Sequence, residues 1–268
     1  MTLRVPESYP GAVGAGSRPA ADTRAATAEG GPCTRTRALL RVVAWARRAP
    51  RTGQTLPLVW TVGEDALLLG ADLAQRSARS ADDPVRQIID AGAALHHARV
   101  AAEAIGWATA VDRFPDPDDP DLVARVRLTV AVPSLLAASE LAALAGTRSG
   151  RPLDHVPVPE PALHRLAGAA AREGAYAVPV VGRSETGAAT SWVVLGGPDD
   201  TPASWLRTGE GLSAAMLQAC RDELLAEPLP VVPQHLLDAA DSGLLNDTHG
   251  RATLPHLVLR VALAGHLD

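Results

Sequence analysis

The 268-residue chain contains no lysine, few aromatic residues and only two cysteines. All 25 basic side chains are arginine, which indicates a bias in codon usage rather than a binding surface. Aromatic residues make up only 3% of the chain, so a core must be built from alanine, leucine and valine. Cys33 and Cys220 lie far apart in unlike contexts, which predicts a reduced, cytoplasmic protein without a disulfide framework.

Further absences exclude whole classes of function. No apolar run approaches the roughly 20 residues of a membrane span. The net charge of −5 and a pI near 5.9 come with no visibly basic face, so we expect neither a membrane nor a nucleic-acid partner. There is no G-x-S-x-G motif, no P-loop and no G-x-G-x-x-G after a strand.

The N-terminal residues 1–35 lack the basic-then-apolar order of a signal peptide. They are rich in glycine, proline, alanine and threonine, so we expect a disordered tail with no core of its own. A further hypothesis is that this tail binds another protein.

The remaining sequence predicts helices within 34–49, from Pro84, and within 134–146, 162–174, 202–227 and 233–240. Strands are expected within 58–72, 107–114, 122–130, 175–181, 190–196 and 255–263. These elements alternate without a regular βαβ rhythm, which favours an α+β fold over a doubly wound sheet. The order helix, loop, strand occurs twice, which suggests two similar halves, 36–133 and 134–268, in one globular unit.

The stretch "AGAALHHARVAAEAIGW" places His96 and His97 side by side in a run of small residues. Neighbours on a helix point about 100° apart, so one metal ion cannot easily bind both. No ligand-type residue lies three or four positions from the pair, where a zinc site would need one. The pattern predicts a helix buried among other helices and no metal site.

Three other motifs have to be weighed. The loop "TRSGRPL" carries Arg148, Ser149 and Arg151, which together can hold a phosphate, although a solvated loop with two arginines is the simpler interpretation. The acidic run "DRFPDPDDPD" is typical of a turn rather than of a calcium or catalytic site. Cys220, inside a predicted helix, is expected to be a small buried residue rather than a nucleophile.

A longer set of motifs, in a fixed order along the chain, favours a functional interpretation of the arginine loop. The segment "DAGAALHHARVAAEAIGWATAVDRFPDPDDPDLVARVRL" is followed by "VLGGPDD", "SWLRTGEGLSAAMLQA", "EPLPVVP" and "PHLVLRV". This set closely resembles the Acg-type NAD(P)H nitroreductases, a divergent branch of the FMN-dependent nitroreductase family. The resemblance runs from about residue 36 to the end of the chain, and the two histidines match the family's packing helix.

The resemblance implies a nitroreductase-like α+β fold made of two fused related halves, with a mixed or antiparallel sheet packed by helices. It implies a monomer with an internal pseudo-dimer, or a homodimer. Arg148, Ser149 and Arg151 match the loop that holds the FMN phosphate, and Gln54 and Thr55 match the segment that meets the flavin ring. NAD(P)H would be the electron donor and a small nitro compound or quinone the acceptor. No catalytic side chain is assigned, because the cofactor carries the chemistry.

The chain also departs from the family pattern. Gln54 replaces an asparagine, Leu56 a glutamine, Leu58 a tryptophan and Ala91 a cysteine. Only "VGRSETGAA" joins two strands where the family has a longer segment that helps to cover the flavin. These departures leave a second hypothesis open: a degenerate, non-catalytic member that sequesters flavin or acts as a scaffold.

Overall fold

The structure is a computed structural model that describes residues 3–6, 32–53, 57–63, 66–71, 84–145, 151–152, 156–183, 189–229, 231–247 and 249–265. Its helices are α1 (Pro32–Ala46), α2 (Pro84–Ala104), α3 (Leu135–Ala145), α4 (Glu160–Arg172), α5 (Pro202–Arg221) and α6 (Gln234–Asp241). Its strands are β1 (Leu3–Pro6), β2 (Leu58–Val62), β3 (Ala66–Ala71), β4 (Trp107–Arg113), β5 (Leu122–Val130), β6 (Arg151–Pro152), β7 (Tyr176–Arg183), β8 (Ala189–Gly197), β9 (Leu224–Pro228) and β10 (Leu254–Gly265).

The first sheet has the strand order β1-β2-β3-β5-β4. Every neighbouring pair in it is antiparallel. Side chains alternate between buried and partly exposed along β2, as expected for a strand with one face on a core. That core is shared with α1 and α2, and Trp60 and Leu95 are fully buried in it.

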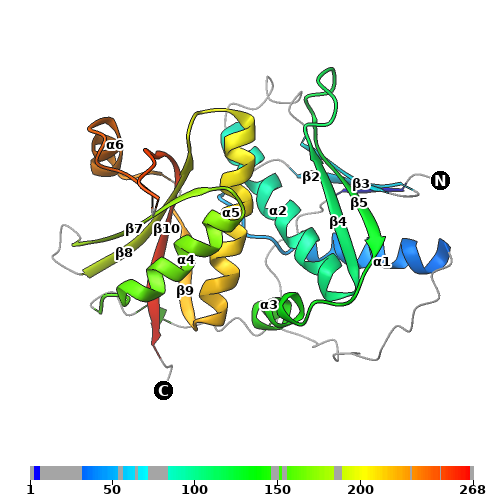
Figure 1. Ribbon diagram of the computed structural model, residues 1–268, viewed down its shortest axis with the longest axis horizontal. Helices are drawn as coiled ribbons and strands as arrows, with labels where there is room; N and C mark the ends of the chain where they lie inside the picture. Colours follow the sequence, from blue (N-terminus) through cyan, green and yellow to red (C-terminus); the bar gives the residue numbers. More distant parts are fainter. Residues whose placement is uncertain are drawn as a thin grey trace.

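The second sheet has the order β6-β10-β8-β7. Strand β9 also pairs with β10, along residues 259–263, whereas β6 pairs with residues 264–265. Its pairings are also antiparallel. The described part of the chain is therefore α+β with two antiparallel sheets. Of the two sheet types expected, mixed or antiparallel, the described strands form the antiparallel one. Helices α4 and α5 cover one face with a second core. Helix α6 lies on the opposite side, where Leu236 and Val258 belong to a smaller cluster (Figure 1).

The two sheets lie on opposite sides of a central helix pair, α2 and α5 (Figure 1). These helices make the largest contact between any two helices described. Their backbones touch because Gly92 and Gly209 face one another: a Cβ atom on Gly209 would lie 1.9 Å from the Ile89 carbonyl oxygen. Leu206 of α5 joins the first core and Ile89 of α2 joins the second, so the two cores interlock.

One expectation about an element boundary was wrong. Helix α5 ends at Arg221 instead of continuing to Glu227, and residues 224–228 form β9. Leucine, alanine and glutamate favour helix, but pairing with β10 overrides that preference. The turn is fixed by Glu223, whose φ of 56° lies in the left-handed region, and by Asp222, whose carboxylate accepts hydrogen bonds from Gln218 and Arg165.

Within residues 1–35, which were expected to form a tail, the structure describes residues 3–6 and 32–35. Residues 3–6 pair with β2, and α1 begins at Pro32. A four-residue strand is too short to show a period of two, and only its partner strand reveals it. Within the described residues, no helix combines the length and hydropathy that a bilayer crossing requires.

Candidate functional site

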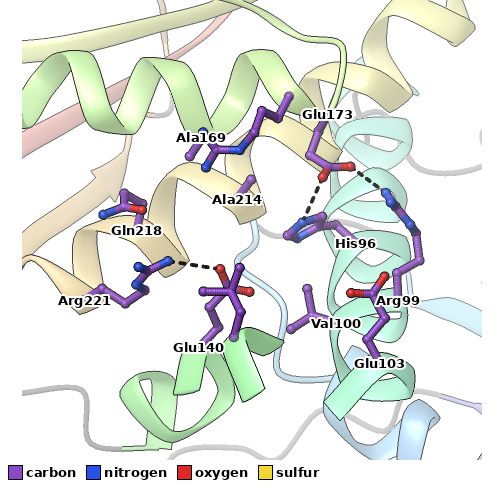
Figure 2. A pocket seen from close by; sticks show the side chains of 12 residues that line it. His96, Arg99, Val100, Glu103, Glu140, Ala169, Glu173, Ala214, Gln218 and Arg221 are labelled. Carbon is purple, nitrogen blue, oxygen red and sulfur yellow. Dashed lines mark hydrogen bonds and ion pairs between the residues drawn. The ribbon is translucent and has the colours of Figure 1, made fainter. Parts of the chain in front are cut away.

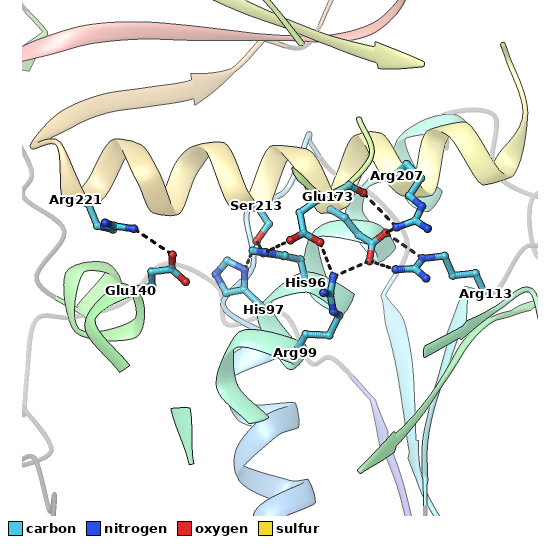
Figure 3. A network of polar contacts seen from close by, with 10 residues as sticks. His96, His97, Arg99, Arg113, Glu140, Glu173, Arg207, Ser213 and Arg221 are labelled. Carbon is cyan, nitrogen blue, oxygen red and sulfur yellow. Dashed lines mark hydrogen bonds and ion pairs between the residues drawn. The ribbon is translucent and has the colours of Figure 1, made fainter. Parts of the chain in front are cut away.

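Polar side chains gather along the seam between α2 and α5, where the two cores meet (Figure 3). The network contains His96, His97 and Arg99 from α2, Glu173 from the end of α4, and Glu210 and Ser213 from α5. Helix α2 is buried on nearly all sides, which confirms the prediction of a helix packed among other elements.

Glu210 is the centre of one group of ion pairs. Its carboxylate is fully buried and accepts hydrogen bonds from Arg113 Nη2 at 2.7 Å and Nε at 3.0 Å. Arg99 and Arg207 lie at 3.4 Å and 3.3 Å from the same carboxylate. A two-point arginine contact to a carboxylate fixes geometry as well as charge. This group therefore ties α5 to α2 and to the end of β4.

Glu173 carries a second group. Arg99 Nη1 donates to its Oε2 atom at 2.5 Å, and His96 Nε2 lies 3.6 Å from Oε1. Burial alone would raise the pKa of Glu173, but the neighbouring His96 and Arg99 lower it to about 2. Glu173 therefore remains a carboxylate across the physiological pH range.

The two histidines share a single hydroxyl group. The Nδ1 atoms of His96 and His97 each lie 2.7 Å from Ser213 Oγ. One hydroxyl has one proton to donate, so when both rings are neutral at least one must donate its own Nδ1–H to Oγ. Burial and the neighbouring His96 lower the pKa of His97 to about 3, which keeps this ring neutral.

A small cavity opens beside this network, between α2, α3, α4 and α5 (Figure 2). Its volume is about 180 Å³. Most of its lining is charged or polar, and the lining side chains are His96, Arg99, Val100, Glu103, Leu136, Glu140, Ala169, Arg172, Glu173, Ala214, Gln218 and Arg221.

The network has no exposed nucleophile. Ser213, the hydroxyl next to a histidine, is completely buried. In the described part of the chain, no group of three or more histidine, cysteine or acidic side chains is placed to hold a metal ion. The seam can therefore orient charges and bind a small polar molecule in its cavity, but it offers no attacking group.

The flavin-site residues expected from the sequence fall mostly outside the described residues. This applies to Gln54, Thr55, Arg148 and Ser149, and to the side chain of Arg151. The backbone of Arg151 lies in β6, opposite Gly265 of β10.

The structure does describe the residues that precede Gln54, Arg51 and Thr52 among them. Asp90 Oδ1 on α2 accepts hydrogen bonds from the backbone N–H of Thr52 at 2.8 Å and from its hydroxyl at 2.9 Å. Arg51 Nε lies 3.7 Å from the other oxygen of this buried carboxylate. The residues just before the expected flavin contacts are therefore fixed to the central helix.

The turn predicted for the acidic run after β4 is confirmed. This run is exposed, and Asp116 Oδ1 accepts a hydrogen bond from the backbone N–H of Asp118. Cys220 is only partly buried, which corrects the expectation of a buried residue. It lies in the last turn of α5, beyond the tightest contact with α2.

The sequence did not indicate that Glu173 and Glu210 belong to this site, since a single glutamate in a helix normally indicates a solvent-exposed face.

Comparison with known proteins adds a relationship. No protein-family model matches the chain. The chain is similar to two proteins from Mycobacterium tuberculosis, strains CDC 1551 / Oshkosh and H37Rv, each named "Putative NAD(P)H nitroreductase". Each is 35% identical over 135 residues, which is 50% of this chain and 39% of the relative. These matches support the relationship to nitroreductases that the sequence motifs predicted.

Proposed function

Because the chain is related to the nitroreductases, we propose that it is an FMN-binding, nitroreductase-like protein that uses NAD(P)H to reduce nitro compounds or quinones. The observation that carries this proposal is the 35% identity to the two mycobacterial proteins over half of the chain. The α+β architecture is compatible with it. When bound, FMN would supply the transfer of hydride and electrons from donor to acceptor.

The residues of the chain fit the chemistry of this cofactor. Two guanidinium groups and a hydroxyl, from Arg148, Arg151 and Ser149, match the donors that a phosphate dianion prefers. The backbone of Arg151 pairs with Gly265 of β10. We infer that Arg148, Ser149 and Arg151 hold the phosphate.

Asp90 supports the other part of the proposed site. It holds Thr52 by two hydrogen bonds, two residues before Gln54. A contact segment attached to a rigid helix loses less conformational entropy when a ligand binds. Gln54 and Thr55 would orient the flavin ring, and no side chain of this chain is proposed to act as a nucleophile.

Two of the departures from the family pattern are changes inside the core. Leu58 is buried on β2 and Ala91 is buried on α2, and both belong to the first core. Neither replacement therefore removes a group from an exposed binding surface.

The remaining departures support a second candidate, a non-catalytic protein that sequesters flavin or acts as a scaffold. Leu56 stands where the family has a polar glutamine, and strands β7 and β8 pair as far as Arg183 and Ala189, which leaves little chain to cover a cofactor. An open site exposes a reduced flavin to water and oxygen, which would favour binding without turnover.

The first experiment is a visible spectrum of the purified protein, followed by FMN titration. The variant Arg148→Ala/Arg151→Ala is compared with Arg41→Ala/Arg47→Ala, which removes two exposed arginines, one on α1 and one just after its end. Each lost charged hydrogen bond costs about 1.5–3 kcal/mol, so the first variant should weaken FMN binding at least 100-fold and the control should not. A folded protein that ignores FMN would refute both candidates in which flavin is bound.

An NAD(P)H oxidation assay then separates enzyme from sequestering protein. The FMN-loaded protein is mixed with NADH or NADPH and a nitroaromatic compound or a quinone. Acceptor-dependent turnover supports the reductase, whereas tight FMN binding without turnover supports sequestration.

A further inference from the structure

We propose that the cavity between α2, α3, α4 and α5 binds a small amino carboxylate, a molecule with an ammonium and a carboxylate group joined by a short aliphatic chain. None of the residues that line this cavity is among those proposed to hold the flavin, and the inference does not rest on that proposal. Its volume, about 180 Å³, is below the range of roughly 300–1,000 Å³ found for pockets that hold drug-sized ligands. A flavin or a dinucleotide is therefore too large for it.

The charges of the lining are balanced. Three arginines, Arg99, Arg172 and Arg221, face three glutamates, Glu103, Glu140 and Glu173. A ligand with a net charge would leave one charge of the lining or of the ligand uncompensated in a partly enclosed space, which is unfavourable. A dipolar ligand keeps the balance. The lining therefore selects against simple anions and simple cations.

Most of these charges already have partners within the protein. Arg99 binds Glu173 and approaches Glu210, and Arg221 Nη1 lies 3.3 Å from Glu140 Oε1. Figure 2 shows these pairs at the edges of the cavity. These ion pairs hold the side chains of the cavity wall in place, and their charged groups have little remaining hydrogen-bonding capacity for a ligand.

One group of each sign has capacity left. The guanidinium of Arg172, at the last residue of α4, has no hydrogen-bond or ion-pair partner among the described residues. The same holds for the carboxylate of Glu103 on α2, which interacts with Arg99 only through its charge. Arg172 would bind the carboxylate of the ligand, and Glu103 its ammonium group.

The rest of the lining suits the carbon chain of such a ligand. Val100, Leu136 and Ala214 offer apolar surface. Gln218 donates its amide hydrogen to Asp222 at 3.0 Å, so its carbonyl oxygen is available to accept a hydrogen bond from the ammonium group. The combination of one free cation, one free anion and apolar side chains defines the ligand class.

The test is calorimetric titration of the full chain with 4-aminobutanoate, butanoate and butylamine, which share a four-carbon chain and differ in charge. We expect 4-aminobutanoate to bind at least ten-fold more tightly than either singly charged compound. Equal binding of butanoate, or no binding of any of the three, would overturn the proposal.

Variants locate the site. Arg172→Gln and Glu103→Gln should each weaken 4-aminobutanoate binding at least ten-fold, while Arg172→Lys, which keeps the charge, should retain part of it. Arg41→Gln on α1 is the matched control and should bind as the wild type does. Thermal unfolding of each variant shows whether it is folded. Unchanged binding in folded Arg172→Gln would contradict the assignment, and FMN titration of the same variants reports on the flavin proposal separately.

Discussion

Arg113 and Glu210 form a two-point ion pair, with distances of 2.7 Å and 3.0 Å, between the end of β4 and the middle of α5. These residues are 97 positions apart in the sequence, in the two parts of the chain that build different sheets. The carboxylate is fully buried, so it is stable as an anion only while its arginine partners surround it.

Glu210→Gln should therefore lower the free energy of unfolding by about 3–5 kcal/mol, the usual cost of breaking a buried ion pair from one side. The loss arises because Arg113 and Arg207 then lose their carboxylate partner, while Arg99 keeps only Glu173. Urea denaturation at pH 7 measures it. Asp112→Asn, which removes an exposed ion pair with Arg127, is the control and should cost no more than about 1 kcal/mol.

The close approach of α2 and α5 gives a second prediction. A Cβ atom on Gly92 would lie 2.1 Å from the carbonyl oxygen of Leu206, so Gly92→Ala must push the two backbones apart. We expect a loss of about 3 kcal/mol or more, at the upper end of the cost of overpacking. Gly168→Ala on α4 is the matched control, since its Cβ would meet only the end of Arg172 at 4.0 Å. Because alanine favours helix more than glycine does, the control should gain up to about 1 kcal/mol.

The pKa of His97 predicts how stability depends on pH. It is lowered from 6.5 to about 3 by burial and by His96, so the folded protein holds fewer protons on this ring than the unfolded chain between these values. The contribution of the neutral ring to the unfolding free energy is complete above pH 6.5 and is lost as the pH falls towards 3. His97→Gln should therefore flatten the pH dependence of the unfolding free energy between pH 4 and 6.5.

Urea denaturation at several pH values in this range checks that expectation. His164→Gln removes an exposed histidine on α4 and serves as the control. In NMR spectra, the ring protons of His97 should not shift between pH 8 and 5. A titration of these protons near pH 6.5 would show that the ring is not held neutral by its surroundings.

Composition and local pattern were enough to predict burial of α2, because small residues occur on all its sides. They also predicted the turn after β4, whose prolines and aspartates act locally. The polar partners of α2 could not be predicted in the same way. Ser213, which both histidines contact, is more than 100 residues away, and β9 forms only because β10 lies beside it. Such contacts depend on the packing of the two sheets around the central helices and have no local signal.

Thr52 connects the described structure with the proposed flavin site. Its hydroxyl donates to Asp90 at 2.9 Å, and Thr52→Val removes this hydrogen bond while keeping the shape and the backbone hydrogen bond. We expect a stability loss of about 1–3 kcal/mol from the weakened Asp90 interaction. If Gln54 and Thr55 contact flavin, FMN should also bind several-fold more weakly, because their segment is less well ordered before binding. Thr208→Val, which removes the hydroxyl that contacts His256 at 2.9 Å, is the control for a lost buried hydroxyl. Equal FMN affinity in the two variants would show that the segment after Thr52 does not bind the cofactor.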